Sequence, residues 1–418
     1  MHNYRLFLII VLWINFIVTA LPKRVIKTYT ELLIGAIVSG SGHITQALLA
    51  VGHQRHYTTY YWLLEKGRWS WLSIMRQLVT LIMRFFPRKQ WHLIIDDFIC
   101  PRVSHKAPHV KYHCEHSQKP NRPRYLWGQQ WVALGLSLRW GKVIAALPLL
   151  LKLHKYVGNG TKLSTAVSLI SQVAPLFRRQ KEAIVRCLVD AWYMKAPFVL
   201  PLLQQGIHVI GQVRKDTVLF LQPSEASDKS RRRGRPRKYG MRLTEKALDR
   251  LALHHAELHV YGSLKHVTYR WSRCVARFLK GQLVIAVWCR LPGQTNWTLI
   301  ISTDVSLTPE RIIKLFARRW KIEPMFNEIK HQYGITQAWE QKNQTLHRWV
   351  SMICLAYSLT RLLALLAAAK SNQHAVPLIQ WRKKQPITAG MMRLGLQLFF
   401  RQFTFLQLWD KKSKKLKL

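Results

Sequence analysis

The sequence predicts an α/β protein: a mixed sheet flanked by helices, with an all-helical N-terminal region and a β-rich insertion. Three observations lead to this fold class. Residues 28–87 contain short apolar segments with helical spacing. Residues 91–189 carry apolar strand-like runs around one helical stripe. Further strand-like runs fill residues 208–291, after which helical spacing returns.

The size and charge of the chain limit its class. Its 418 residues suggest two or three domains, and a hydrophobic fraction of 49% excludes a disordered protein. There are 65 Lys and Arg but only 19 Asp and Glu, which gives a net charge of +46. Such a charge favours a polyanionic partner, with nucleic acid expected first and an acidic membrane surface second. The six cysteines form no C-x-x-C pair, so we expect reduced, structural thiols.

Residues 6–22 are almost wholly apolar, interrupted only by Asn15. One interpretation is a buried first helix of a helical domain. The other is a secretory or membrane segment, with small residues at 18–20 as a cleavage site. The sequence leaves both open.

Three short helices are expected over residues 31–37, 44–51 and 57–64, because glycine-containing turns separate three periodic segments. Their lengths and tight turns resemble a helix-turn-helix, whose second helix would enter a DNA groove. The alternative is a small helical bundle without that role.

Two predicted strands end in acidic residues. The strand over residues 91–95 runs into Asp96 and Asp97, and the strand over residues 183–189 runs into Asp190. Open α/β sheets bind ligands at the carboxyl ends of their strands. Neighbouring carboxylates repel one another unless a cation lies between them, and Mg²⁺ prefers such oxygen ligands. The alternative is that these residues only cap helices or turns.

Between these two strands we expect a hairpin and a helix. Residues 131–139 and 143–149 alternate like paired strands, and residues 163–177 carry a helical stripe that Pro175 kinks or shortens. The segment before the hairpin is rich in proline and histidine. We interpret it as a loop or a set of phosphate contacts rather than a zinc site, although it holds His105, His109, His113, Cys114 and His116.

A helix is expected over residues 311–331, after a strand over residues 297–303. Thr308, Pro309 and Glu310 supply a cap, a first-turn proline and a first-turn acid. Pro324 is expected to kink this helix.

Four side chains of this helix fall on one narrow stripe. Arg319, Glu323 and Lys330 lie 3, 7 and 14 residues after Phe316, which places all four on one side at 100° per residue. One carboxylate therefore lies among cations that can hold phosphates. A plain salt-bridged helix face is the alternative.

Asp190 and Glu323 are 133 residues apart (323 − 190), far more than one helix and one strand require. The interval alternates like a β-rich insertion, with strands expected over residues 208–214, 218–221, 257–261, 266–277 and 283–291.

Asp96, Asp190 and Glu323, in this order, resemble the catalytic triad of DDE transposases, which have an RNase H-like fold. The helix resembles the Y-x-x-R-x-x-x-E-x6-K signature of bacterial insertion-sequence transposases, with Phe316 in place of the tyrosine. In the segment IIDDFICPR we favour Asp96 as the first acid, with Asp97 as the alternative. The segment CLVDAWYM resembles the second motif, and the β-rich insertion fits one branch of this family.

This resemblance implies metal-dependent cleavage and strand transfer at insertion-sequence ends by cut-and-paste transposition. Asp96, Asp190 and Glu323 would hold two Mg²⁺ or Mn²⁺ ions, and Arg319 and Lys330 would contact DNA together with the signature position Phe316. It also implies double-stranded DNA as partner, a synaptic homodimer and a bacterial cytoplasmic, nucleoid-associated protein. The rivals are a decayed, non-catalytic DNA-binding protein and a membrane protein.

Two basic segments add expected phosphate contacts. Gly-Arg-Pro within residues 230–238 resembles an AT-hook, whose arginines enter a narrow minor groove, although a solvated basic loop is the alternative. Its candidate DNA-binding residues are Arg233, Arg235, Arg237 and Lys238. Residues 411–417 are expected to form a flexible, phosphate-binding tail.

These patterns suggest five units along the chain. They are a helical domain over residues 1–88, the first part of the catalytic core over 89–215, the insertion over 216–296, the rest of the core over 297–375, and a basic tail over 376–418. The apolar helix expected over residues 349–369 would pack on the sheet, or its length would suit a membrane.

Overall fold

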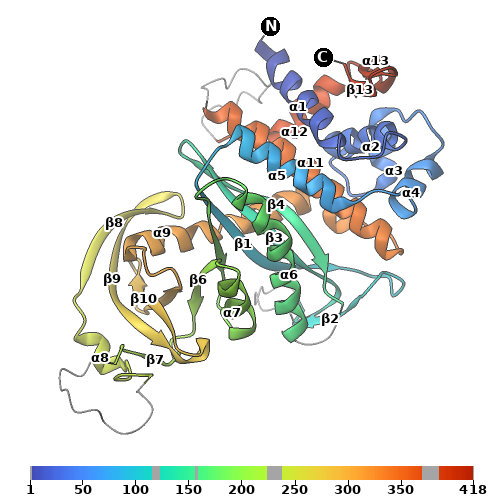
Figure 1. Cartoon of the computed structure of the whole chain (residues 1–418). Helices are drawn as coiled ribbons and strands as arrows, with labels where there is room; N and C mark the ends of the chain where they lie inside the picture. The colour runs from blue at the N-terminus through green and yellow to red at the C-terminus, as the bar shows by residue number, and fades with distance from the viewer. Residues whose placement is uncertain (1, 115–122, 156–158, 224–237, 370–385, 418) are drawn as a thin grey trace.

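The structure is a computed structural model that describes residues 2–114, 123–155, 159–223, 238–369 and 386–417. Figure 1 shows helices gathered around both chain ends, a central sheet beside them, and a curved continuation of that sheet on the far side. This mixed α/β arrangement, with a large mixed sheet and N-terminal helices, is compatible with the predicted RNase H-like fold class.

The N-terminal region is helical, as predicted. Its helices are α1 (His2–Val18), α2 (Ile26–Ser39), α3 (Ile44–Val51), α4 (Tyr57–Glu65) and α5 (Trp71–Phe85). The apolar stretch at the start is a helix whose residues Ile10, Ile14 and Ile17 are fully buried. It packs against α5 and α11, so it lies within the protein core in this structure.

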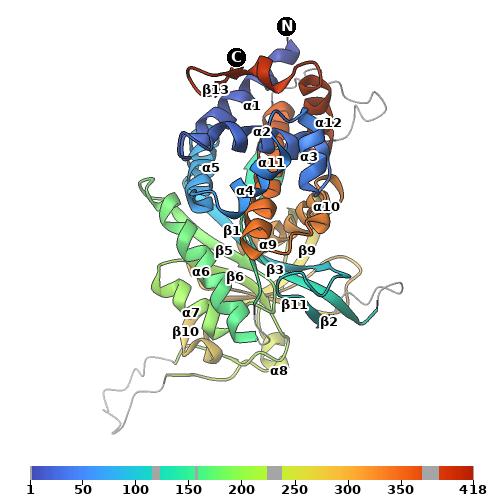
Figure 2. The same ribbon diagram turned by 90° about the vertical axis from the view of Figure 1, so that its right-hand side faces the viewer.

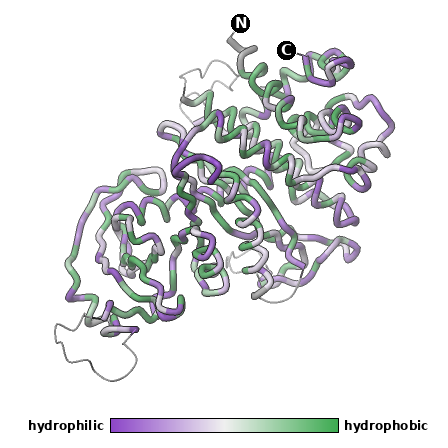
Figure 3. The backbone as a smooth tube through the Cα atoms, in the orientation of Figure 1, coloured by the Kyte–Doolittle hydropathy of each residue, from purple (hydrophilic) through white to green (hydrophobic). Residues whose placement is uncertain are grey.

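The long apolar helix α11 (Asn343–Ala369) joins this N-terminal group. It contacts α1, α2, α4 and α5 as well as β4 of the sheet, and Ser358 Oγ donates to the Pro148 carbonyl at 3.1 Å. In the described chain it is the single helix long and apolar enough to cross a membrane, or one of two if the bent pair α2–α3 counts as a span. Its most apolar window is 89% buried, which is typical of a core helix. Figure 3 shows hydrophobic residues running along these helices and the central strands.

The central sheet has the order β4-β3-β1-β5-β6. Strand β3 is antiparallel to β1 and β4, whereas β1, β5 and β6 are mutually parallel. The predicted hairpin, helix and second strand are thereby confirmed. The elements are β1 (Gln90–Pro101), β2 (Lys111–Cys114), β3 (Tyr125–Trp140), β4 (Val143–Leu153), α6 (Asn159–Arg178), β5 (Ile184–Val189), α7 (Ala196–Gln204) and β6 (His208–Val213).

Strand β1 is longer than predicted. The sequence suggested an end at residue 95, but Asp96 and Asp97 lie inside a strand that continues to Pro101. The cause is its partner β3, which pairs with β1 from His92 to Pro101 and keeps the backbone extended. On the other side, β5 pairs with β1 only as far as Ile94. The acids therefore lie where the parallel neighbour stops, at the edge that open sheets use for ligands.

The expected β-rich insertion is present, but its strands extend the central sheet. Strand β11 pairs with β6, β10 pairs with β11, and β9 pairs with β10. Both β8 and β7 pair with β9, and all of these pairings are antiparallel. Figure 1 shows β8, β9 and β10 curving around α9, which contacts β5, β6, β8 and β10. Their bounds are β7 (Leu219–Phe220), α8 (Glu245–Asp249), β8 (His254–Val260), β9 (Ser263–Ala276), η1 (Arg277–Leu279), β10 (Gln282–Arg290) and β11 (Thr298–Ser302).

The helix expected over residues 311–331 consists of two helices, α9 (Pro309–Arg319) and α10 (Ile322–Gln332). The cap is as predicted, because Thr308 Oγ1 accepts the backbone N–H of Arg311. The break falls at Trp320–Lys321, not at Pro324. Proline is tolerated in the first turn of a helix, where its missing N–H would have no partner, and Pro324 lies in the first turn of α10.

The expected flexible tail is folded. Residues 386–417 contain α12 (Ala389–Phe400), α13 (Phe405–Leu408) and a hairpin of β12 (Trp409–Asp410) and β13 (Lys415–Leu416). Asn15 fixes this hairpin to α1: its Nδ2 donates to the Leu416 carbonyl at 3.0 Å, and its Oδ1 accepts the Leu416 N–H at 2.8 Å. Figure 2 shows the two chain ends close together above the helices.

Candidate active site

Asp96 and Asp190 come from adjacent parallel strands. Asp96 lies in β1, and Asp190 directly follows β5. Side chains alternate between the faces of a strand, so Asp96 and Phe98 share one face. Phe98 packs against Phe326 of α10, with ring centroids 4.7 Å apart, so this face lies under α10. The first acid therefore points toward the helix pair that carries Arg319 and Glu323.

Arg319 connects the predicted acids. Its Nη1 donates to Asp96 Oδ2 at 3.2 Å, and its Nη2 lies 3.7 Å from Glu323 Oε1. The Arg319 side chain is only 14% exposed. Its charge also lowers the pKa of Asp190, so one guanidinium acts on all three carboxyl groups.

The carboxyl groups resist ionisation. Burial raises the pKa of Asp96 to about 7, with further repulsion from Asp190 and Asp97, while Arg319 opposes the shift. Burial also raises the pKa of Asp190, although the backbone N–H groups of Tyr193 and Trp192 donate to its Oδ1 at 3.2 and 3.0 Å. Burial raises the pKa of Glu323 as well, again opposed by Arg319. Such a site favours an additional cation.

Asp97 has other partners. Its Oδ1 accepts from Lys162 Nζ at 2.7 Å and from the Tyr193 hydroxyl at 3.0 Å, and its Oδ2 accepts from Gln130 Nε2 at 2.6 Å. As the next residue on β1 it projects to the face opposite Asp96, toward α6. Lys162 also lies 3.6 Å from the centroid of the Trp192 ring. Asp97 is thus held by three donors, which favours Asp96 over Asp97 as the first acid.

The other signature residues lie deeper than the sequence suggested. Phe316 was expected at a DNA contact, but it is 7% exposed and lies in the hydrophobic core, because α9 is wrapped by the curved sheet. Its ring lies 5.8 Å from Arg319 Cζ and supports that guanidinium. Lys330 Nζ lies 5.1 Å from the ring centroid of Phe98. The Arg319 side chain is likewise mostly buried, and it contacts Asp96 and Glu323.

Some predicted residues fall outside the described part of the chain. Arg233, Arg235 and Arg237 of the AT-hook-like segment are among them, as is His116. Lys238 is described, and it packs beside Gly281 in the turn before β10. Of the proline- and histidine-rich segment, His113 Nε2 lies 3.1 Å from the Gly128 carbonyl, which it can contact without a metal.

No group of three or more His, Cys, Asp or Glu side chains in the described residues is arranged to hold a metal ion. Asp96 and Asp190 still form a pair whose charges disfavour each other. Mg²⁺ commonly uses one or two carboxylates, with waters and substrate phosphates as its other ligands. The pair fits that requirement, and Glu323, 41% exposed, is separated from it by the Arg319 guanidinium.

Sequence reasoning missed the residues that support this site. Lys162, Gln130 and Tyr193 hold Asp97, and Arg102 fixes the segment after α10 by donating to the Ala338 carbonyl at 2.7 Å and to the Thr336 carbonyl. Tyr193 lay within the second motif, which offered a signal. The other three are isolated polar residues whose partners are distant in sequence, so no local pattern identifies them.

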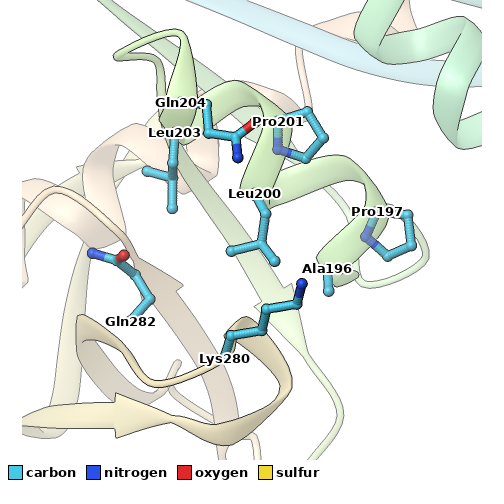
Figure 4. Close-up of a pocket in the computed structure, with 8 residues that line it drawn as sticks. All are labelled: Ala196, Pro197, Leu200, Pro201, Leu203, Gln204, Lys280 and Gln282. Carbon is cyan, nitrogen blue, oxygen red and sulfur yellow. The ribbon is translucent and has the colours of Figure 1, made fainter.

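Among the hollows in the described residues, two lie near the sheet. One of about 610 Å³ is next to Asp190 and is lined by Ala191, Gln212, Arg214 and Trp297 among others. The second, of about 660 Å³, lies between α7 and the start of β10, where Figure 4 shows Leu200 and Lys280 directed into it. Its lining of apolar side chains, Lys280 and two glutamines contains no carboxylate, so the acids remain the candidate centre.

A family model described as DDE superfamily endonuclease matches residues 23–275, more than half of the chain. The matched range includes Asp96 and Asp190 and ends before Glu323. A search of curated proteins found no match.

Proposed function

We propose that this chain, which belongs to the DDE superfamily endonuclease family, is a DNA transposase that cleaves and rejoins strands at the ends of an insertion sequence. Family membership implies a transposase-like nuclease that acts on DNA. The observation that carries the finer proposal is the contact of the Arg319 guanidinium with both Asp96 and Glu323, together with its electrostatic effect on Asp190.

Divalent metals are typical of nucleases of this superfamily. Asp96 and Asp190 would hold the metal, with Glu323 as third ligand once its contact with Arg319 is exchanged. When bound, Mg²⁺ or Mn²⁺ supplies Lewis-acid activation of the attacking oxygen and charge neutralisation at the leaving oxygen, and two ions are the usual number in such reactions.

The protein's own groups prepare the site for a phosphodiester. Arg319 offers the positive charge that a scissile phosphate requires, and the carboxyls that it contacts compete for the same guanidinium. Asp96, with a pKa of about 7, can hold or release a proton at neutral pH. The signature of Phe316, Arg319, Glu323 and Lys330 supports the insertion-sequence branch, with Lys330 proposed to contact a DNA phosphate nearby.

We further propose that transposition follows a cut-and-paste route. Cleavage at both ends of an element requires two active centres, which favours a homodimer in the synaptic complex. A role on chromosomal DNA places the protein in the bacterial cytoplasm. The division into a helical N-terminal unit, a catalytic core interrupted by the insertion, and a C-terminal unit remains part of this proposal.

The test is cleavage of a supercoiled plasmid that carries the DNA flanking this gene. The purified protein is expected to nick it in Mg²⁺ but not in EDTA, and Asp190→Asn is expected to abolish nicking. Asp249→Asn is the matched control, because the Asp249 side chain is 82% exposed and lies in an ion pair with Arg270. Equal nicking by Asp190→Asn and the parent would refute the catalytic proposal. DNA binding without nicking by the parent would favour the decayed, non-catalytic protein.

A further inference from the structure

A second cluster of ionisable groups lies near the starts of β1 and β5, at the opposite side of these strands from the catalytic acids. It comprises His92 and five arginines and is called the arginine cluster below. His92 and Arg186 are neighbours across β1 and β5 near the start of both strands. Asp96 lies farther along β1, just beyond its pairing with β5, and Asp190 follows the last residue of β5. His92 and Asp96 are four residues apart on one strand, roughly 13 Å. The arginines are Arg88, Arg139, Arg186, Arg311 and Arg318.

Most positive charges of the arginine cluster have no acidic partner among the described residues. Of its five arginines, Arg186 forms an ion pair there: Asp304 Oδ2 lies 2.6 Å from Arg186 Nη2, and Asp304 Oδ1 accepts from Ser306. Burial, together with repulsion from Arg311, Arg139 and Arg88, lowers the pKa of Arg318 to about 10. Burial and four of these guanidiniums lower the pKa of His92. These arginines are therefore close enough to repel one another.

The floor of the arginine cluster has unused hydrogen-bonding atoms. Ser137, His92 and Arg186 lie side by side across β3, β1 and β5. Their side chains are buried, with His92 3% and Arg186 2% exposed. Ser137 Oγ, His92 Nε2 and Arg186 Nη1 nevertheless have no partner among the described residues. Buried polar atoms usually find a partner, so these three leave unused hydrogen-bonding capacity beneath the more exposed guanidiniums of the cluster.

The rim of the arginine cluster is open to solvent. Arg139 is exposed, and Arg88, Arg311 and Arg318 are half-buried. Arg311 reaches Gln90 Oε1 at 3.3 Å, so the rim spans the start of β1 and α9. A ligand can approach from outside and meet several guanidiniums at once.

We propose that the arginine cluster is a phosphate-binding site for the DNA backbone, separate from the catalytic acids. The choice of DNA as the phosphate source rests on the proposed function. An acidic surface of a second copy is a poor occupant, because the chain has 19 acidic residues against 65 basic ones. A duplex carries one phosphate charge per about 1.7 Å of its axis, both strands counted, so one duplex can place phosphates at both sites roughly 13 Å apart.

The test measures DNA binding without catalysis. A fluorescein-labelled duplex of arbitrary sequence is titrated with protein in EDTA at several salt concentrations. Arg139→Gln and Arg318→Gln are compared with the parent, and Arg401→Gln, an exposed arginine at the end of α12, is the matched control. Each cluster variant is expected to weaken binding by about tenfold. Each is also expected to reduce the slope of log K against log salt by about one.

A merely structural role predicts a different result in the DNA-free protein. Because the arginines repel one another, Arg318→Gln is expected to leave the melting temperature unchanged or raise it, whereas loss of a structural contact would lower it. Affinity and salt slope equal to those of the parent in both cluster variants would overturn the proposal. Inorganic phosphate is tested by thermal shift. If it stabilises the parent but not Arg318→Gln, while duplex binding is unaffected, the site takes a free anion and the assignment to DNA is wrong.

These readouts do not depend on cleavage. If the parent never nicks DNA in Mg²⁺, the proposed transposase activity fails, but loss of duplex affinity in Arg139→Gln and Arg318→Gln would still establish the phosphate site. If nicking is present and both variants bind DNA like the parent, the phosphate site alone is refuted.

Discussion

Arg319 Nη1 donates to Asp96 Oδ2 at 3.2 Å, so the end of α9 and the first acid on β1 are in direct contact. The same guanidinium lies 3.7 Å from Glu323 Oε1. It supplies part of the positive charge that these acids require. We expect a bound divalent cation and Arg319 together to neutralise the negative charges of Asp96, Asp190 and Glu323. Several measurements test this expectation.

The contribution of Asp96 to the stability of the metal-free protein should fall as pH rises from about 4 to about 7. The pKa of Asp96 is about 7 when folded and near 3.8 when unfolded, so the folded state keeps a proton that the unfolded state loses in this window. Asp96→Asn removes this contribution. Denaturant unfolding at pH 4 and pH 7 should therefore show that the variant gains stability relative to the parent at the higher pH, on the order of a few kcal/mol. An unchanged difference between the two pH values would contradict the buried position of Asp96.

Arg319→Gln should change how the site binds Mn²⁺. Without the guanidinium, less positive charge opposes the cation, so at pH 9 the variant is expected to bind Mn²⁺ about tenfold more tightly than the parent. Its affinity should then decline at a higher pH than that of the parent, because Arg319 lowers the pKa of Asp96 and Asp190. Calorimetric titration across pH 6–9 measures both effects, with the exposed Arg401→Gln as control. Equal affinities at pH 9 would mean that Arg319 does not face the cation.

Asp97→Ala should destabilise the fold more than Asp96→Asn does. It leaves Lys162, whose side chain is 9% exposed, without its anionic partner, at a cost of about 3 kcal/mol. Asp96→Asn should instead abolish nicking while the protein stays folded. Melting temperatures and nicking assays on both variants test this division. If Asp97→Ala melts like the parent, the assignment of Asp97 as a structural acid is incorrect.

Asn15→Leu should release the C-terminal hairpin. The Asn15 side chain makes two hydrogen bonds to the Leu416 backbone, which a leucine cannot form. Trypsin is expected to cut at the lysines of residues 411–417 several times faster in the variant than in the parent. Asn296→Leu, an exposed position far from this hairpin, serves as the control. Equal cleavage rates would show that the hairpin is held by other contacts.

Local patterns in the sequence predicted most of the elements. Periodicity located the N-terminal helices, the hairpin of β3 and β4, and the strands of the insertion, because these depend on neighbouring residues. The extent of β1 depends on the register of β3, and the folded tail depends on Asn15, 401 residues away from Leu416. Neither pairing leaves a local signal.

The candidate site was predicted in a similar, partial way. Asp96, Asp190, Glu323 and Arg319 stood out because acids are scarce in this basic chain and the helix spacing placed the last two on one side. The burial of Phe316 was not predicted, because it follows from the curved sheet closing around α9. The three donors to Asp97 were not predicted either, because Lys162, Gln130 and Tyr193 lie in separate parts of the sequence.

The central claim is that Asp96 and Asp190 form a metal-binding centre that Glu323 joins once its contact with Arg319 is exchanged. Iron-directed backbone cleavage tests it most directly: Fe²⁺ replaces the native cation, and ascorbate with peroxide generates radicals that cut the chain close to the ion. Cuts should appear near all three residues, disappear with excess Mg²⁺, and be absent in Asp190→Asn. Cuts confined to the histidine-rich segment around residues 105–114, or near only one of the three acids, would contradict the account.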